Sequence, residues 1–527
     1  MNNVTLEQWK TWQGKYTLLP YIRTIRSPGE ALLPLVWDRF WRDASSYSCI
    51  LESGKGGRYT IAGLHPAEVI EGKGREARIW SPDGEDWTEQ ARLRGAPIEV
   101  VRSWLGGWTA PRPEGYPDCN GGAVGFWSYD MARSLEKLPE LAADDLGWPD
   151  YLFQRYERLW IADHRQGTVH LAVHAAVGPD VSEDGLAFCY REAERAADEM
   201  ERQWRDWCRV ADDPETLSRL RRMRGLLEED RLEIDVEKLP GLTTSLNKEG
   251  YQDAVRRVQA YIGQGDAFQV NLAIRQSLPV ETPAEQLYEW LRIVNPSPYM
   301  GMLRTPGFSL VSASPELLVK LDRGKLSARP IAGTRRRGRT PEEDRAMEDE
   351  LLSSEKERAE HIMLVDLERN DLGRVAAYGT VKVPELLTIE RYSHVMHLVS
   401  QVEARLAPGK DALDVAAAMF PGGTITGAPK IRTMEIIEEL EPVRRGPYTG
   451  SMGWIDYAGN MEFNIIIRTI AVTGGVCHIQ AGAGIVIDSD PEREFYECLN
   501  KAKALWKAVQ YGQRFAERAA GRVQPPV

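Results

Sequence analysis

Cysteine is scarce in this sequence, and its spacing shows no pairing that would mark a structural or metal-binding framework. The chain has 527 residues and 6 cysteines. None of them forms a Cys-x-x-Cys pair, and no cysteine–histidine spacing suits zinc. We therefore expect reduced thiols, as in cytoplasmic proteins, and neither disulfides nor a zinc site. The six are Cys49, Cys119, Cys189, Cys208, Cys477 and Cys498.

Long apolar runs are also missing from the sequence. Residues 1–15 are polar and aromatic, without the apolar segment of a secretory signal. No stretch elsewhere is long and apolar enough to cross a bilayer, which takes about 20 residues. These absences predict a cytoplasmic protein with no membrane partner.

Positive charge is in deficit. The chain has 66 Lys and Arg residues against 78 Asp and Glu residues, which gives a net charge of −12. That balance, together with the lack of a basic arm, argues against non-specific binding of nucleic acid. It does not exclude an anionic substrate, because a local pocket can be positive within an acidic protein.

Repeats and low-complexity tracts are absent, and the composition is ordinary for a globular protein, with 43% hydrophobic residues. A chain this long exceeds one ordinary core, so we expect either two domains or one large interleaved unit. A charged stretch interrupted by Pro214, Pro240 and Gly241 is the best linker candidate. The predicted regions are therefore an N-terminal region 1–210, a linker 211–245, a second region 246–515 and a tail 516–527.

Helices and strands are both expected, in an order that does not alternate. Short apolar runs between turn residues in the first region are typical of antiparallel strands. Helical spacing follows at Gly185–Arg209 and over the long stretch Pro341–Asn370, and the apolar run Met461–Val472 predicts one strand of a meander. Because strands and helices do not alternate strictly, the sequence predicts an α+β fold and not a TIM barrel.

Two pairs of glutamates stand three residues apart on predicted helices. One pair is Glu357 and Glu360, and the other is Glu494 and Glu497. This spacing puts both carboxylates of a pair on one helix face. Two such faces brought together would make an oxygen-rich cage that suits Mg²⁺. The alternative is that both pairs lie on solvated helix faces, as most such pairs do.

A small-residue segment and an arginine stand among apolar strands. Gln480–Ile485 contains Gly482 and Gly484, whose bare backbone would allow N–H groups to approach a carboxylate. The alternative for this segment is a bulged strand. Arg468 follows three isoleucines and needs a partner anion if it is buried. That partner is either a substrate carboxylate or a structural salt bridge.

His397 is a candidate acid or base, because the charge of a histidine can change near neutral pH, although a lone histidine is more often structural. No Ser-His-Asp order, nucleophile elbow or reactive cysteine motif is present.

The region from about Tyr251 to Val509 resembles the chorismate-binding enzyme family over nearly its full length. The matching phrases are Gly265-Asp266, Phe268-Gln269-Val270-Asn271, Asn295-Pro296-Ser297-Pro298-Tyr299-Met300, Arg329-Pro330-Ile331-Ala332-Gly333-Thr334, Ala359-Glu360-His361, Asp366-Leu367-Glu368-Arg369-Asn370-Asp371-Leu372, Gly422-Gly423-Thr424, Gly427-Ala428-Pro429-Lys430 and Gln480–Ile485 with Asp488-Ser489. The first region resembles the N-terminal part of anthranilate synthase and aminodeoxychorismate synthase large subunits. The resemblance implies large antiparallel sheets packed as a sandwich with helices outside.

The resemblance also implies a site for magnesium and chorismate. Glu360 and Glu497 would be the principal ligands of Mg²⁺, with Glu357 and Glu494 assisting, and the ring carboxylate of chorismate would sit on the metal. The groups that would meet the substrate's enolpyruvyl carboxylate or line its ring are Arg468, Tyr448, the backbone of Gly482, Ala483 and Gly484, Gly333 and Thr334. His397 would act on ring protons or on the leaving hydroxyl, and Lys501 would lie near the substrate.

The implied reaction replaces the C4 hydroxyl of chorismate, with help from a metal and a general acid, by an attack of ammonia. Ammonia has to arrive unprotonated. The chain has no Cys-His glutaminase signature, so a separate glutamine amidotransferase subunit should supply it. Family members that add water carry lysine at the position of Gln269, and an amide cannot act as a base for water.

Two products remain open. Ala332 matches the anthranilate synthases, whereas many aminodeoxychorismate synthases carry a lysine nucleophile there. The sequence of the whole chain most resembles a branch of aminodeoxychorismate synthase component I that also carries alanine at the position of Ala332. We therefore favour 4-amino-4-deoxychorismate, of the folate and p-aminobenzoate pathway, over anthranilate plus pyruvate, of the tryptophan pathway. A non-catalytic regulatory protein that binds chorismate or tryptophan is a third hypothesis, which the intact catalytic positions disfavour.

A tryptophan effector is a further expectation. Two phrases resemble the halves of the tryptophan pocket in anthranilate synthases. In this interpretation Glu52 and Ser53 would bind the polar head of the amino acid, and the other half would pack the indole. The alternative is that these residues only pack the two halves of the chain together. The second half comprises Asn295, Pro298, Tyr299 and Met300.

Overall fold

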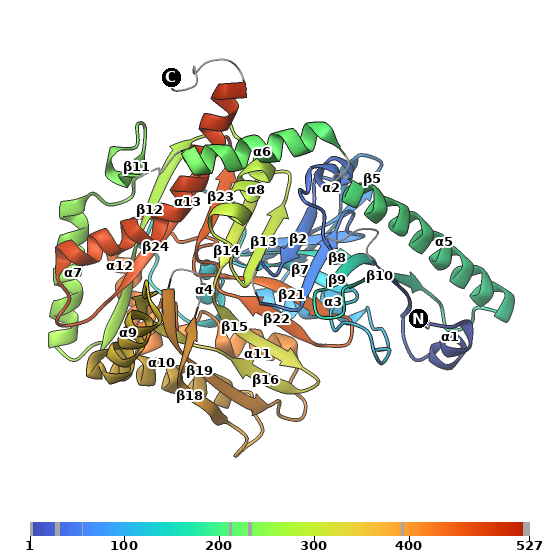
Figure 1. Cartoon of the computed structure of the whole chain (residues 1–527). Coiled ribbons are helices and arrows are strands. Elements are labelled where there is room, and N and C mark those ends of the chain that lie inside the picture. The colour runs from blue at the N-terminus through green and yellow to red at the C-terminus, as the bar shows by residue number, and fades with distance from the viewer. Residues whose placement is uncertain are drawn as a thin grey trace.

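The computed structural model describes residues 4–26, 32–54, 56–209, 213–229, 234–391 and 395–519. Within these ranges the chain forms two large antiparallel sheets of 12 strands each, with helices on their outer faces (Figure 1). The predicted α+β class, with large antiparallel sheets, is confirmed. Residues 211–212 and 230–233 of the predicted linker, and 520–527 of the predicted tail, lie outside the described ranges.

The first sheet joins strands from both ends of the chain. At its centre β2 pairs with β13, so that Glu52 lies opposite Met300. Its strands, in spatial order, are β1 (Leu18–Arg26), β10 (Thr168–Ala176), β9 (Arg158–Asp163), β3 (Tyr59–Gly63), β2 (Ser48–Glu52), β13 (Tyr299–Arg304), β14 (Ser309–Ser314), β23 (Thr469–Thr473), β24 (Val476–Ile485), β12 (Gln269–Pro279) and β11 (Thr243–Thr244), with β20 (Gly427–Ala428) beside β12.

The second sheet is interleaved in the same way. Here β21 of the second region pairs with β7 of the first, with Gly453 opposite Gly125. The order is β17 (Ile331–Arg336), β19 (Val395–Arg405), β16 (Lys325–Ala328), β15 (Leu317–Asp322), β22 (Met461–Asn464), β21 (Ser451–Asp456), β7 (Gly122–Trp127), β8 (Tyr151–Tyr156), β4 (Glu68–Lys73), β5 (Glu76–Asp83) and β6 (Asp86–Arg94), with β18 (Lys382–Arg391) beside β19. The regions predicted as 1–210 and 246–515 therefore share both sheets.

Alternation along β7 shows how the second sheet is buried on both faces. Val124 and Phe126 point into the larger hydrophobic cluster, which also contains the apolar side chains of the first sheet. Ala123 and Trp127 point into a second cluster on the opposite face. A strand covered on both sides reads as a continuous apolar run, which is what this segment shows.

Helices cover the outer faces (Figure 1). The first sheet is covered by α1 and α5 at one end and by α7, α8, α12 and α13 at the other, whereas α3, α9, α10 and α11 lie against the second. Their bounds are α1 Leu6–Trp12, α2 Asp38–Asp43, α3 Pro97–Gly106, α4 Ala132–Leu135, α5 Glu183–Cys208, α6 Pro214–Glu229, α7 Lys248–Gly263, α8 Ala284–Val294, α9 Pro341–Ser353, α10 Glu355–Gly373, α11 Ala412–Met419, α12 Lys430–Leu440 and α13 Pro491–Ala519.

Two predicted elements differ from the structure. The helix expected over Pro341–Asn370 is two helices, because Ser354 ends α9 and its side chain accepts a hydrogen bond from Glu357 N to start α10. The strand expected over Met461–Val472 is also two elements. β22 belongs to the second sheet and β23 to the first, and residues 465–468 cross between them.

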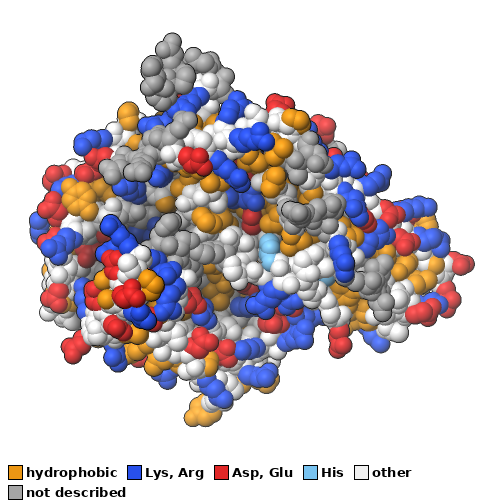
Figure 2. Space-filling view, in the orientation of Figure 1, with side chains coloured by type: hydrophobic (Ala, Val, Ile, Leu, Met, Phe, Trp, Pro, Cys, Tyr) orange, Lys and Arg blue, Asp and Glu red, His pale blue; other side chains and the backbone are white. Residues whose placement is uncertain are grey.

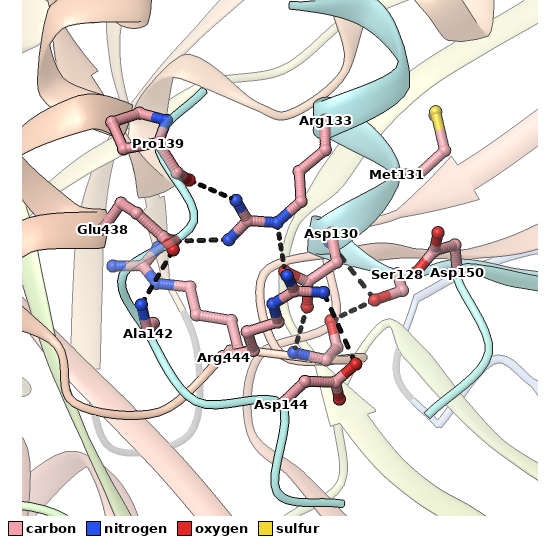
Figure 3. A network of polar contacts seen from close by, with 12 residues as sticks. Ser128, Asp130, Met131, Arg133, Pro139, Ala142, Asp144, Asp150, Glu438 and Arg444 are labelled. Carbon is pink, nitrogen blue, oxygen red and sulfur yellow. Dashed lines mark hydrogen bonds and ion pairs between the residues drawn. The ribbon is translucent and has the colours of Figure 1, made fainter. Parts of the chain in front are cut away.

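A network of charged groups ties the two regions together (Figure 3). Arg133, from the first region, pairs with Glu438 of α12 and with Asp130, at 3.2 Å from the latter. The Glu438 carboxylate also accepts hydrogen bonds from the backbone N–H groups of Leu141 and Ala142, at 2.8 and 2.9 Å. A buried carboxylate with this many donors is fully satisfied, so the packing of α12 depends on it.

We expect Glu438→Ala to lower the free energy of unfolding by roughly 2–5 kcal/mol, because it removes one of the two carboxylate partners of Arg133 and leaves two backbone donors without an acceptor. Chemical denaturation followed by tryptophan fluorescence measures the change. Glu435→Ala, which removes a half-exposed pair with Arg432 on the same helix, is the matched control and should cost less than about 1 kcal/mol. Equal losses for the two variants would contradict a structural role for the network.

Candidate active site

Arg468 lies where the chain crosses between the two sheets, and its backbone adopts a left-handed conformation there. Arg468 has a φ of 53°, a conformation that a residue with a side chain adopts at a cost. The side chain is partly buried, and its Nη1 donates to the carbonyl oxygen of Lys501 at 2.8 Å. Burial lowers the pKa of Arg468, which Tyr448 and Glu497 partly offset. Among the described residues no carboxylate forms an ion pair with Arg468, so its charge is available to an anion.

Beside this arginine, β24 presents an open edge. β24 pairs with β12 in continuous register, so the bulge considered for Gln480–Ile485 is not present. Its pairing with β23 ends where Ile470 lies opposite Ile479. Beyond that point, alternate backbone N–H groups of β24 face away from β12 without a partner strand in the described sheet. This segment therefore offers donors to a ligand, as its small residues predict.

The two acidic pairs lie on α10 and α13 and share one environment. Burial raises the pKa of Glu360, and the neighbouring carboxylates Glu357, Glu494 and Glu497 raise it further. Each of the four glutamates already has a partner. Arg335 Nη1 lies 3.0 Å from Glu357, Lys356 Nζ 3.9 Å from Glu360, Ser489 Oγ 2.7 Å from Glu494 and Lys501 Nζ 2.8 Å from Glu497. The arrangement is a facing set of oxygen ligands whose mutual repulsion a cation would relieve.

The described residues hold no group of three acidic, histidine or cysteine side chains already gathered around one point. By chemistry and neighbourhood, however, the four carboxylates suit a magnesium ion. To ligate it they would have to draw together, and Glu357 and Glu497 would have to leave Arg335 and Lys501.

His397 and Thr334 face each other on β19 and β17. Thr334 Oγ1 lies 3.0 Å from His397 Nδ1, and the carbonyl oxygen of Gly333 lies 3.3 Å from the same nitrogen. Burial lowers the pKa of His397, so the ring is neutral at pH 7. Gly333 has a φ of 64°, and a Cβ on it would lie 3.0 Å from Glu357 Oε2. The histidine and the acidic pair of α10 are therefore neighbours across β17.

Gln269 and Tyr448 complete the predicted set. Gln269 lies on β12 beside Gly484 of β24. Burial raises the pKa of Tyr448, and the Arg445 guanidinium lies 5.7 Å from its ring centroid. Lys501 Nζ donates to the carbonyl oxygen of Gly482 at 3.0 Å.

Comparison with known proteins decides the family. Residues 47–507 match the family described as chorismate binding enzyme. The chain belongs to the chorismate-binding enzyme family. It is an enzyme that acts on chorismate, as its sequence motifs predict.

Relatives of this chorismate-binding enzyme include proteins of two different names. Aminodeoxychorismate synthase component 1 of Bacillus subtilis is 43% identical over 93% of this chain and 98% of its own length. Anthranilate synthase component 1 of Thermus thermophilus is 43% identical over 94% of this chain and 98% of its own length. The crystal structure of anthranilate synthase component I from Streptococcus pneumoniae aligns with a TM-score of 0.66 at 30% identity, covering 85% of this chain and 92% of that one.

The chorismate-binding enzyme has a buried carboxyl in the electrostatic neighbourhood of Lys501 that the sequence did not predict. Glu316 lies between β14 and β15, where the chain makes another crossing from the first sheet to the second, and its carbonyl oxygen accepts a hydrogen bond from Ile465 N. Burial raises the pKa of Glu316 to about 7, and the Lys501 ammonium partly offsets this. The signal in the sequence was an acidic residue, in Ser314-Pro315-Glu316, between two apolar strands.

A cavity of about 740 Å³ lies between the two sheets of the chorismate-binding enzyme, near β2 and β13. Five of the six residues predicted to bind tryptophan line it, namely Glu52, Ser53, Pro298, Tyr299 and Met300. Asn295, the C-terminal cap of α8, is not among the lining residues.

The polar groups at this cavity differ in their partners. The Glu52 carboxylate is engaged with Arg292 at 3.0 Å, Tyr288 at 2.9 Å and Trp37 at 3.2 Å. It would have to give up one of these bonds to hold an amino group. Ser53 Oγ is buried and, within the described part of the chain, has no hydrogen-bond partner.

No helix in the described ranges is both long and apolar enough to span a membrane. Side chains of both charge signs are interspersed over the face shown in Figure 2.

Proposed function

We propose that this enzyme aminates chorismate with ammonia, in the presence of Mg²⁺, to give 4-amino-4-deoxychorismate. The observation that carries the proposal is Arg468, a partly buried cation without a carboxylate partner among the described residues, beside a strand edge with free N–H groups. The acidic pairs of α10 and α13 lie in the same electrostatic neighbourhood. Chorismate is a dicarboxylate. One of its carboxylates would bind Arg468, and the other would bind a metal ion held by the glutamates of α10 and α13.

The residues that would hold magnesium are Glu360 and Glu497, with Glu357 and Glu494 assisting. When bound, the metal would neutralise the ring carboxylate and polarise the substrate. Arg468, Tyr448 and the backbone of Gly482–Gly484 would hold the enolpyruvyl carboxylate by charge-assisted hydrogen bonds. Gly333 and Thr334 would line the ring.

Two side chains would carry the proton chemistry, and a third restricts the choice of nucleophile. His397 is neutral at pH 7 and can accept a proton from the ring or from the attacking amine. Glu316, with a pKa of about 7, can donate a proton to the departing hydroxyl. Gln269 cannot deprotonate water, so the site suits a nucleophile that needs no base.

We expect Glu316→Gln to lower kcat by about 10²–10⁴-fold, because an amide keeps the shape but cannot act as an acid. A raised pKa means that Glu316 is protonated below about pH 7. In the wild type, kcat at saturating ammonia should therefore fall as the pH rises through about 7, and the variant should lack this limb. Glu403→Gln, at a surface pair with Lys325, is the control. An unchanged pH profile in Glu316→Gln would remove the acid role.

The ammonia is proposed to come from a separate glutamine amidotransferase subunit. The names of the relatives, component 1, fit a chain that works with another component. Glutaminase chemistry needs a reactive thiolate. Burial raises the pKa of Cys49, Cys477 and Cys498 to about 12 and that of Cys119 well above its usual value. Those four thiols are unsuited to attack glutamine.

Anthranilate is the second candidate product, and Ala332 favours it. Ala332 lies on β17 opposite Leu398 and offers no amine that could attack the ring. Identity does not separate the two products, because the chain is 43% identical to a relative of each name. The sequence phrases that resemble the alanine-carrying branch of aminodeoxychorismate synthase component I favour the first product. Purified protein incubated with chorismate, Mg²⁺ and an ammonium salt decides between them. Aminodeoxychorismate keeps its enolpyruvyl group, whereas anthranilate is fluorescent and appears with equimolar pyruvate. Anthranilate as the product would overturn the first proposal.

We also propose that tryptophan binds in the 740 Å³ cavity, with Ser53 at its polar end and Pro298, Tyr299 and Met300 around the indole. Bound tryptophan should raise the melting temperature of the wild type by mass action. Ser53→Phe, which fills the cavity, should abolish the shift. The absence of any shift in the wild type at millimolar tryptophan would contradict the proposal.

A further inference from the structure

Two side-chain amides on β12 lie side by side without using their oxygens. Gln269 and Asn271 are two residues apart on one strand, so both side chains project from the same face. Gln269 Oε1 and Asn271 Oδ1 are shielded from solvent, and no residue in the described ranges donates a hydrogen bond to either. A shielded acceptor without a donor costs roughly 1–3 kcal/mol, so two together indicate that a ligand supplies the donors.

The strand opposite is shaped around these amides. β24 places Gly482 and Gly484 against them, with Gly484 directly opposite Asn271 in the register. A Cβ on Gly482 would lie 2.6 Å from Asn271 Oδ1, and one on Gly484 would collide with the Gln269 amide. Glycine at both positions therefore leaves room for the two amides over bare backbone, on the strand whose edge is open beside Arg468.

The backbone N–H and carbonyl groups of Asn271 form hydrogen bonds with other residues, so the position of this residue does not depend on its side-chain oxygen. Asn271 N donates to Thr426 O at 2.9 Å, and Arg445 Nη2 donates to Asn271 O at 2.7 Å. Lys501 Nζ donates to the neighbouring Gly482 O and pairs with Glu497. The backbone thus fixes the amide's place at the site while its oxygen stays unused.

The two amide oxygens are uncharged hydrogen-bond acceptors, so they favour a small neutral donor over a cation. Ammonia has three N–H groups, so it can donate two of them to two amide oxygens and keep its lone pair for attack. Carboxylates in the same place would favour ammonium, whose lone pair is already protonated. We propose that Asn271, together with Gln269, binds the ammonia nucleophile and orients it toward chorismate. The inference rests on the proposed amination and adds the nucleophile's binding site to it.

The test compares Asn271→Leu with Asn271→Asp in steady-state assays with ammonium salt and chorismate. Leucine has similar volume and no acceptor, and should raise the KM for ammonia about fivefold or more while the KM for chorismate changes less than about twofold. Aspartate has the same shape but carries the negative charge that favours ammonium, so this variant should not regain the wild-type kcat at saturating ammonium salt. If Asn271→Leu fails to fold, Asn271→Ala takes its place with the same expected split.

The outcomes distinguish the ammonia-binding role of Asn271 from the proposed amination of chorismate itself. A KM for ammonia that is unchanged in the leucine variant, or that rises in proportion to the KM for chorismate, would overturn the inference alone. So would a wild-type kcat in the aspartate variant. A wild-type enzyme that does not consume chorismate with ammonium would overturn the proposed function, and the inference with it.

Discussion

Glu360→Ala and Glu497→Ala are each expected to lower ammonia-dependent turnover of chorismate by on the order of 10³-fold or more. Metal polarisation contributes several kcal/mol to a transition state, and each factor of ten corresponds to about 1.4 kcal/mol. Either substitution would remove one of the two principal carboxylates proposed to hold Mg²⁺. Loss of chorismate over time, measured with added Mg²⁺ and after treatment with EDTA, gives the result.

Stability separates this role from a structural one. The raised pKa of Glu360 means that its charged form is disfavoured in the folded protein. Glu360→Ala should therefore be at least as stable as the wild type at pH 7, even though it is inactive. Glu355→Ala, at an exposed position on the same helix, should keep wild-type activity. Near-normal turnover by Glu360→Ala in EDTA-treated buffer would exclude the magnesium site.

Arg468→Lys is expected to raise the KM for chorismate about tenfold or more. Lysine keeps the positive charge but loses the planar fork that binds a carboxylate through two parallel hydrogen bonds. A hydrogen bond to a charged group contributes about 1.5–3 kcal/mol, which corresponds to at least a tenfold change in affinity. Both residues carry a side chain at the same positive φ, so the backbone cost is matched.

The control for this variant is Arg432→Lys, because Arg432 forms ion pairs with Asp266 and Glu435 at the surface. It should leave the KM unchanged. A KM for chorismate that stays at the wild-type value in Arg468→Lys, with a lowered melting temperature, would show that Arg468 only secures the crossing between the sheets.

Local features of this site could be predicted because they depend on spacing within one element. The i, i+3 spacing of Glu357 and Glu360 predicts a shared helix face, and both residues lie on α10. Small residues at 482–484 predict an approachable backbone, and the structure gives β24 an open edge there. The neighbourhood of α10 and α13, far apart in sequence, follows from the family resemblance and not from spacing.

Other features could not be predicted, because local patterns do not show which sheet a strand joins. The run Ile465-Ile466-Ile467 is apolar and β-branched like a strand interior, so its residues do not distinguish the crossing from β22 to β23 from a continuous strand. Glu316 could not be predicted for the same reason, because it lies where the chain crosses from β14 of the first sheet to β15 of the second. The break at Ser354 was missed because the residues on both sides favour helix, and only the cap at Glu357 N marks a new start.

A crystal structure of the enzyme with Mg²⁺ and chorismate tests the central claim most directly. The account predicts that one substrate carboxylate is bound by Arg468 and the open edge of β24. The other carboxylate should lie at a magnesium ion held by Glu360 and Glu497. Chorismate bound with neither carboxylate at Arg468, or a magnesium ion held away from α10 and α13, would contradict it.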